Sequence, residues 1–371
     1  MKKLLTGAFK GFLRAVYWLM KLLAPERENR VVFLSRQSNE PSLDFLELER
    51  CLKQTRPHLE IRMLCRKMKG GLGDDALYFF HILRQMHALA TSRVCIIDTY
   101  IIPVCVLRHR KSLRVIQIWH AIGTVKKFGY QTLGKAGGRD EGLALAMDMH
   151  HGYDAAISGS PAMRPAFAEA FHMEEGRIAI AWPPKLDYLL KNAVQLREKV
   201  RQQYGLEEGR RVVLYAPTYR RNRDYDTEDL TDHLDFSRYT LIVKGHPARD
   251  MTVRDGRALQ CQEYSASELL PAADIVITDY SAISIEAAAL GKAVYLYVYD
   301  LEEYEESVGL NMDLFAELPG CVFRQAAQLA KALEQDYDYE AVRAFAKKYA
   351  PEEGREGAEK ICRLALSSLG Q

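Results

Sequence analysis

Residues 273–291 read ADIVITDYSAISIEAAALG, and the rest of the chain is organised around this stretch. Ile275–Ile277 is a short β-branched run, typical of a parallel strand that is covered on both faces. Asp279 and Ser281 can cap the helix that follows, and Gly291 can end it. A helix that begins at the carboxyl end of a parallel strand presents free N–H groups and the positive end of its dipole. The stretch therefore predicts an anion-binding turn, although an ordinary strand–helix turn has the same pattern.

The composition indicates a globular protein with two domains. The chain has 371 residues, of which 48% are hydrophobic and 27% are charged, and this length suits two domains of ordinary size. The net charge is +2 and no zinc-knuckle or RNA-binding motif occurs, so we expect no nucleic-acid partner. The seven cysteines are scattered and lack CxxC spacing, which favours buried thiols in a reducing compartment and indicates no metal site.

Residues 1–24 are expected to form an amphipathic helix on a membrane surface. On a helical wheel one side carries Lys3, Lys10, Arg14 and Lys21, and the opposite side carries Leu5, Phe9, Phe12, Val16, Leu19 and Leu23. A basic stripe opposite an apolar face is typical of a helix that lies in an anionic membrane surface. The basic residues interrupt the apolar run, which disfavours a signal peptide and a membrane-spanning helix. A helix packed on its own domain remains an alternative.

Strands and helices alternate twice along the rest of the chain. The expected strands are 31–35, 61–65, 94–98, 114–119, 154–158 and 178–181, and then 211–216, 239–244, 274–278 and 293–298. Helices are expected at about 43–52, 74–91, 161–173, 194–204, 325–335, 340–349 and 355–369. This alternation predicts parallel, doubly wound sheets.

The segment Trp182-Pro183-Pro184 divides the two halves, because its prolines cannot extend a strand or a helix interior. We therefore expect a first domain at 30–184 and a second at 185–350. Residues 351–371 are expected to form a C-terminal helix that can cross back to the first domain. Since ligands of such folds bind beyond the carboxyl ends of the strands, two such sheets create a site in the cleft between them.

Two polar clusters follow strands that are expected to face this cleft. Residues 117–127, QIWHAIGTVKK, bring His120 to a strand end, where Gly123 allows close approach of the backbone to a ligand and Lys126 adds charge. Residues 215–221, YAPTYRR, offer the Thr218 hydroxyl and the Arg220 guanidinium, a group that suits phosphate. A structural histidine or a solvated basic loop would explain either cluster alone.

Two further strand ends complete the expected site. Residues 244–247 place the Lys244 ammonium and the His246 imidazole on a turn held by a proline. The opening stretch contributes Asp279, Tyr280, Ser281, Ser284 and Glu286. Glu286 lies about two turns into its helix, where it can accept hydrogen bonds from ribose hydroxyls. Taken together, the four clusters suit a diphosphate held between the domains, without a Walker loop or a GxGxxG fingerprint.

The clusters resemble those of the CDP-glycerol glycerophosphotransferase family, the teichoic-acid primases and polymerases of bacterial cell envelopes. The similarity spans about residues 30–350, and its motifs are Trp119-His120 with Gly123-Thr124 and Lys126, Ala216-Pro217-Thr218-Tyr219-Arg220, Lys244-Gly245-His246-Pro247, Thr278-Asp279-Tyr280-Ser281, Leu290–Val294 and Tyr299–Tyr304. The chain departs from the usual pattern at Ala121, Ala282 and Val308, where the family carries glycine, serine and arginine.

The resemblance implies a GT-B fold, in which two Rossmann-like domains face a central cleft. It implies CDP-glycerol or CDP-ribitol as donor, CMP as product, and a lipid-linked saccharide or growing polymer as acceptor. The protein would then be peripheral at the cytoplasmic face of the cell membrane, with no tightly bound cofactor. It also implies that His120 and His246 are important for activity and that Ser281 contacts phosphate.

On this basis we expect His120 to act as general base for the acceptor hydroxyl. His246, Lys244, Arg220 and the N–H groups near Ser281 would hold the diphosphate. A sugar-nucleotide glycosyltransferase and a non-catalytic membrane-bound relative stay open as alternatives. The choice between glycerol and ribitol, the choice between primase and polymerase, and the oligomeric state also stay open. All of these expectations require that His120 and Ser281 open onto one shared cleft.

Overall fold

The first domain contains a parallel sheet of order β2-β1-β3-β4-β5-β6. Its strands are β1 (Arg30–Ser35), β2 (Glu60–Cys65), β3 (Val94–Ile97), β4 (Arg114–Gln117), β5 (Ala155–Ser158) and β6 (Ile178–Ile180). Its helices are α1 (Lys2–Leu23), α2 (Leu43–Thr55), α3 (Leu72–Thr91), α4 (Ile102–Val106), α5 (Glu141–Ala146) and α6 (Arg164–Phe171), with single 3₁₀ turns η1 (Gly129–Thr132), η2 (Pro161–Met163) and η3 (Glu175–Arg177). The computed structural model describes residues 2–68, 71–218, 220, 227–245, 253–367 and 369.

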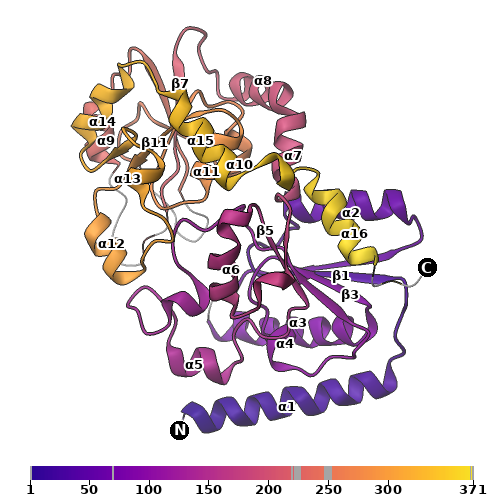
Figure 1. The fold of residues 1–371 in the computed structure, drawn as a ribbon. Coiled ribbons are helices and arrows are strands. Elements are labelled where there is room, and N and C mark those ends of the chain that lie inside the picture. The colour runs from indigo at the N-terminus through magenta and orange to yellow at the C-terminus, as the bar shows by residue number, and fades with distance from the viewer. Residues whose placement is uncertain are drawn as a thin grey trace.

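The second domain contains a parallel sheet of order β12-β11-β10-β7-β8-β9. Its strands are β7 (Arg211–Tyr215), β8 (Tyr239–Val243), β9 (Leu259–Gln260), β10 (Ile275–Thr278), β11 (Ala293–Tyr297) and β12 (Val322–Phe323). The helices around it are α8 (Ala193–Gln203), α9 (Glu228–His233), α10 (Ala266–Leu269), α11 (Ile283–Ala289), α12 (Leu301–Ser307), α13 (Leu314–Glu317), α14 (Ala326–Leu333) and α15 (Tyr339–Tyr349). Figure 1 shows the two domains stacked, with the first below. The expected pair of Rossmann-like domains is therefore confirmed.

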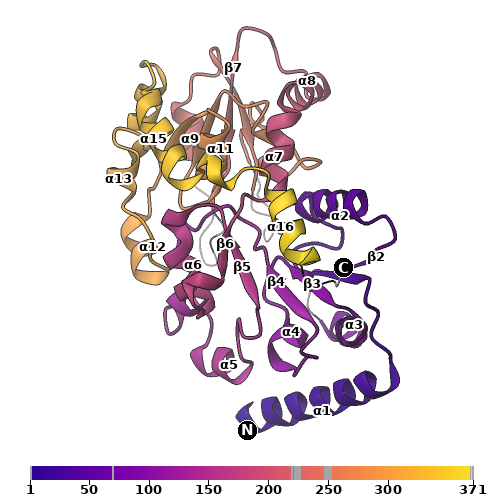
Figure 2. The same ribbon diagram turned by 45° about the vertical axis from the view of Figure 1, so that its right-hand side comes forward.

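Both faces of the first sheet are covered, which explains why its strands read as continuous apolar runs. Val32 and Leu34 of β1 point into a core shared with α3, whereas Val31 and Phe33 pack on the opposite face. There, α2 is joined by the C-terminal helix α16 (Gly357–Leu366), whose Ile361 belongs to the same cluster. Figure 2 shows α16 beside α2, so the chain ends on the domain with which it began.

The chain crosses between the domains twice, and the two crossings lie side by side. The Trp182 N–H donates to the carbonyl of Gly354 at 2.6 Å. A Cβ on Gly357 would lie 2.0 Å from the Trp182 carbonyl oxygen. The two crossing segments therefore lie closer together than any side chain at position 357 would allow. Helix α7 (Pro184–Lys191) begins at the second proline of the break, a position that suits a residue without an N–H group. The last short turn before α16 is η4 (Glu352–Gly354).

Helix α1 packs on the first domain through the side that carries its basic residues. Lys10 donates to the Ala146 carbonyl and pairs with Asp148, Arg14 donates to the Val106 carbonyl, and Lys21 donates to the Arg108 carbonyl. The expectation that this stripe faces an anionic membrane is therefore wrong for these three residues, because their hydrogen bonds go to the protein itself. The side chain of Lys3 lies outside the described residues.

The exposed side of α1 is apolar instead. It carries Phe12, Trp18, Leu19, Leu22 and Leu23. Trp18 is 63% exposed although its neighbour Tyr17 is buried. Figures 1 and 2 both place the helix along the outer edge of the first domain, remote from the second. Of the helices described, none is long and apolar enough to cross a bilayer.

Candidate active site

The first half of the site lies where the strand order of the first sheet reverses, between β1 and β3. Such a reversal opens a crevice at the carboxyl ends of the strands. Ser35 ends β1 and Asp98 follows β3, and the Ser35 hydroxyl donates to Asp98 Oδ2 at 2.9 Å. Burial raises the pKa of Asp98 to about 7, against the opposing effect of this hydrogen bond. The other carboxyl oxygen, Oδ1, has no hydrogen-bond partner among the described residues.

His120 is held over the same crevice. Its Nδ1 lies 3.0 Å from the Asp98 carbonyl oxygen, and the Gln37 amide nitrogen is also 3.0 Å from Nδ1. A carbonyl oxygen only accepts and an amide nitrogen only donates, so Nδ1 cannot bond to both at once. In the tautomer that bonds to Asp98, Nδ1 carries the hydrogen and Nε2 carries the lone pair. The side chain is exposed, and its ring packs 4.2 Å from the Trp119 ring. Trp119 has a φ of 55°, a conformation that costs on the order of 1 kcal/mol or more for a residue with a Cβ.

The second half lies at the corresponding reversal between β7 and β10. Thr218 follows β7 and Asp279 follows β10, and the Thr218 N–H donates to both Asp279 oxygens at 2.9 Å. The Thr218 hydroxyl is buried and has no partner among the described residues. Each domain thus places a hydroxyl and a carboxyl side chain at its own strand-order reversal.

Arg220 is held by carboxylates rather than offered to solvent. Its Nε and one terminal nitrogen donate to Asp300 at 2.7 and 2.9 Å, and the other terminal nitrogen donates to Asp279 at 2.5 Å. Tyr280 is also buried, and its hydroxyl donates to Asp300 at 2.9 Å. Although burial alone would lower the pKa of Arg220, Asp279 and Asp300 raise it above its usual value. These ion pairs fix Thr218 and Asp279, and the phosphate contact predicted for Arg220 stays a prediction.

Ser281 and Ser284 lie at the start of α11. The Ser281 hydroxyl oxygen accepts from the Ile283 N–H at 3.3 Å, and its carbonyl accepts from the Ser284 hydroxyl at 2.8 Å. Ser284 is buried, whereas Ser281 is half-buried. Of these two residues, Ser281 therefore has the better access to a ligand.

Glu286 joins the domains instead of lining the cleft. It is 2% exposed, its Oε1 lies 2.9 Å from the Lys185 ammonium, and its Oε2 accepts from the Ser267 hydroxyl at 2.6 Å. Lys185 belongs to α7, and its N–H donates to Asp44 of α2 at 2.8 Å. The expected contact of Glu286 with a ribose is thus replaced by a buried ion pair that connects α11 to α7.

The loop after His120 contacts the second domain directly. A Cβ on Gly123 would lie 2.8 Å from Ile285 Cδ1, so this glycine accommodates α11 rather than a ligand. The Lys127 N–H donates to the Gly309 carbonyl at 2.9 Å. Thr124 is buried in the same contact, where its hydroxyl donates to the Lys126 carbonyl and accepts from Asn311. The His120 carbonyl oxygen also lies 3.5 Å from the Lys185 ammonium, which pairs with Glu286, so the His120 main chain and α11 are neighbours.

A pocket of about 430 Å³ lies between the domains beside this loop. The first domain lines it with Trp119, Lys126 and Arg139, and the second with Arg220, Asp300 and Tyr304. Burial, together with the Arg220 charge, lowers the pKa of Lys126, against an opposing effect of Asp279. Among the described residues, nothing pairs with the Lys126 ammonium. A lysine ammonium without a protein anion suits a phosphate group.

The predicted cluster at residues 244–247 lies only partly within the residues that the structure describes. The Lys244 ammonium donates to the carbonyls of Cys261 and Gln262 at 2.8 and 3.3 Å, and burial lowers the pKa of the group. His246 lies outside the described residues, so its predicted role stays a prediction. In the part of the chain that is described, no cluster of three or more His, Cys, Asp or Glu side chains could hold a metal ion.

Sequence reasoning missed three residues of this region. Asp98 was assigned only to the end of a strand, Asp300 only to a family motif, and Lys185 to no role. The signal for Asp98 was present, because an aspartate directly after a buried strand matches the position of Asp279. Asp300 and Lys185 gave no such signal, since their partners Arg220 and Glu286 lie 80 and 101 residues away along the chain.

A family model for CDP-glycerol:poly(glycerophosphate) glycerophosphotransferases matches residues 16–367. The chain belongs to this family. A teichoic acid ribitol-phosphate primase of Bacillus spizizenii is 31% identical over 385 residues, which cover 100% of this chain and 99% of that protein. A teichoic acid glycerol-phosphate primase of Bacillus subtilis is 25% identical, with 94% of each chain covered. The resemblance drawn from the motifs is thus confirmed, together with the class of transferase.

Solved structures of other proteins have a similar fold. The wall teichoic acid polymerase TagF superposes with a TM-score of 0.75 and 18% identity, covering 99% of this chain and 98% of that chain. The UDP-GlcNAc 2-epimerase of Neisseria meningitidis superposes with a TM-score of 0.56 and 11% identity. Both likenesses concern the fold, and the first confirms the GT-B-like arrangement of two domains around a cleft.

Proposed function

We propose that the protein transfers ribitol phosphate or glycerol phosphate from its CDP-activated form to a membrane-lipid-linked saccharide, and releases CMP. The observation that supports the proposal is that the loop after the strand-order reversal of the first domain packs on α11, which follows the reversal of the second. One reversal supplies an imidazole, and the other leads into a serine at a helix start. The pocket beside them contains a lysine ammonium that suits a phosphate.

In the proposed reaction, an acceptor hydroxyl oxygen attacks the β-phosphorus of the CDP-polyol. The bond between this phosphorus and the oxygen that bridges to CMP breaks, and CMP leaves with that electron pair. His120 Nε2 receives the proton of the attacking hydroxyl. Lys126, Ser281 and Lys244, with His246, would hold the diphosphate and neutralise the leaving phosphate. Arg220 positions Thr218 and Asp279 through its buried ion pairs.

The donor that we would test first is CDP-ribitol. The ribitol-phosphate primase matches the whole chain at 31% identity, against 25% for the glycerol-phosphate primase of B. subtilis. We also favour a primase over a polymerase, because the ribitol-phosphate primase of B. spizizenii is 31% identical and the poly(ribitol-phosphate) polymerase of the same organism is 25% identical. The exposed apolar side of α1 favours a peripheral position on the membrane that carries the acceptor.

The test is CMP release from CDP-ribitol and CDP-glycerol in the presence of a lipid-linked saccharide. We expect His120→Ala to lower the rate at least about 100-fold, because a general base contributes about that factor or more. His58→Ala removes an exposed imidazole far from the cleft and should leave the rate unchanged.

Three results would contradict the proposal. Near-normal CMP release by His120→Ala would remove this residue from the chemistry. Release of a nucleoside diphosphate from a sugar nucleotide would instead identify a glycosyltransferase, and nucleotide binding without any product would identify a non-catalytic relative.

A further inference from the structure

A second concave site lies on the outer side of the first domain, between the edge strand β2 and helix α3. It is a groove of about 660 Å³. Its apolar part includes Leu64, Phe80 and Leu83, and its cationic part consists of Arg62, Arg84 and His87. On α3 the lining positions recur at helical spacing, so one face of the helix forms one wall. The active-site cleft lies at the opposite, carboxyl ends of the strands, so the groove has no part in the site described above.

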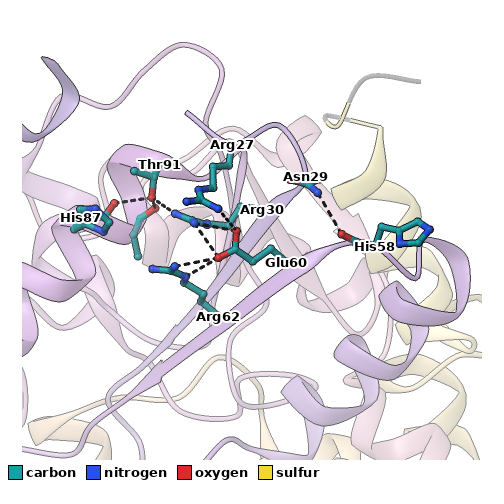
Figure 3. Close-up of polar contacts among 9 residues, drawn as sticks. Arg27, Asn29, Arg30, His58, Glu60, Arg62, His87 and Thr91 are labelled. Atoms are coloured by element: carbon teal, nitrogen blue, oxygen red, sulfur yellow. Dashed lines mark hydrogen bonds and ion pairs between the residues drawn. The ribbon is translucent and has the colours of Figure 1, made fainter. Parts of the chain in front are cut away.

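Positive charge is in excess at this end of the sheet. Figure 3 shows Arg27, Arg30 and Arg62 converging on the single carboxylate of Glu60. Three arginines against one glutamate leave an excess of two positive charges. Arg30 is buried, whereas the Arg62 side chain is 41% exposed and reaches the groove.

Arg84 adds another cation on the facing helix. Its side chain is exposed and makes no hydrogen bond or ion pair with any described residue. Partial desolvation lowers the pKa of His87, and the charges of Arg62, Arg30 and Arg27 lower it further. The groove is therefore a site in which an anion would be stabilised from two sides.

The apolar part of the groove continues onto the exposed face of α1. Phe80 is 63% exposed, its ring lies 6.2 Å from the Phe79 ring, and Phe79 lies 6.3 Å from Phe12 of α1. An apolar surface that ends in a cationic groove matches a phospholipid, whose acyl chains and phosphate are joined in this order. A free phosphate would use the cations and leave the aromatic surface without a role.

We propose that the groove between β2 and α3 binds the phosphate head group of an anionic membrane phospholipid, with Phe80 and the α1 face against its acyl chains. The inference rests on the part of the proposed function that places the protein at a membrane. It adds a defined lipid site, with a preference for negative charge, to the apolar contact of α1.

The test is co-sedimentation of the full chain with vesicles of phosphatidylcholine alone or with added phosphatidylglycerol. We expect stronger binding to the anionic vesicles, and Arg84→Gln should weaken that binding about fivefold, the usual effect of one basic residue near an anionic surface. Arg108→Gln is the matched control, because Arg108 is exposed near the end of α1 but lies outside the groove. It should bind like the wild type, and both variants should keep wild-type CMP release.

Three results would overturn the inference. Equal losses for Arg84→Gln and Arg108→Gln would indicate diffuse surface charge, and equal binding to both kinds of vesicle would indicate no anion site. Displacement by inorganic phosphate beyond that caused by sodium chloride of equal ionic strength would identify a site for free phosphate. The vesicle assay requires no catalytic turnover. It therefore tests the lipid site even if the protein has no transferase activity, and failure of the proposed function can be distinguished from failure of this inference. A Trp18→Ser variant that loses all vesicle binding would locate the α1 contact separately.

Discussion

At the scale of single residues, the carboxyl ends of the central strands concentrate polar groups that have unusual surroundings. Asp98 is the clearest example, because one of its oxygens has a single serine donor and the other has no partner among the described residues. The position keeps its carboxyl group largely protonated up to near neutral pH. His120 depends on the same residue, since its Nδ1 bonds to the Asp98 carbonyl.

Asp98→Asn should therefore change how the free energy of unfolding depends on pH. The pKa of Asp98 is raised from 3.8 to about 7 in the folded state, mainly by burial. A raised pKa favours folding in acid, and this contribution is lost as the pH rises from about 4 to about 7. Asparagine cannot ionise, so relative to the wild type the variant should gain up to about 4 kcal/mol between these values. Urea denaturation at pH 5 and pH 8 measures the difference in the free energy of unfolding between the variant and the wild type. An equal difference at both pH values would show that Asp98 does not titrate in this range.

At the scale of elements, most strands and the longer helices follow from the sequence pattern. β-branched runs predicted the central strands because burial on both faces is a local property of a parallel strand. Short elements such as β9, β12 and α13 had no pattern long enough to read. Helix α1 was correctly predicted as a helix, but the prediction that its basic side faces a membrane was wrong, because Leu13 and Tyr17 are buried on that side.

The docking of α1 depends on Tyr17, and Tyr17→Phe should loosen it. The hydroxyl bonds to His109 Nδ1 at 2.9 Å, while His109 Nε2 bonds to the Val104 carbonyl at 2.8 Å and so carries the hydrogen. Phenylalanine leaves the half-buried Nδ1 without its donor, which costs about 1 kcal/mol. Trp18→Phe changes an exposed neighbour and should have an effect within about 0.5 kcal/mol. Hydrogen exchange of α1 measures both, and equal protection in the two variants would contradict the assigned bond.

At the scale of the whole molecule, two kinds of contact hold the domains around the cleft. Main-chain hydrogen bonds join the loop after His120 to Gly309, and the buried ion pair of Lys185 with Glu286 joins α7 to α11. Because α11 begins just after Ser281, this ion pair also sets the distance between the two halves of the site. Burial lowers the pKa of Lys185, but Glu286 and Asp44 more than offset this effect, so the ammonium stays charged.

Lys185→Met should destabilise the protein by about 3–5 kcal/mol, because it leaves the Glu286 carboxylate buried without its cation. The double variant Lys185→Met/Glu286→Leu removes both charges and should recover most of this loss. Urea denaturation of the two single variants and the double variant gives the coupling energy. If the double variant were as unstable as the sum of the single variants, the two side chains would not be coupled.

The sequence by itself determined the two parallel sheets, the break between them and the strand ends that carry His120, Thr218 and Ser281, because hydrophobic periodicity and chain-breaking prolines act over short stretches. Only the tertiary structure decided which partner each charged group takes. Arg220 pairs with Asp300 and Glu286 with Lys185, and the basic side of α1 faces its own domain. These choices depend on the packing of segments far apart in the chain, where desolvation of a charge is offset only by the particular group that the fold brings beside it.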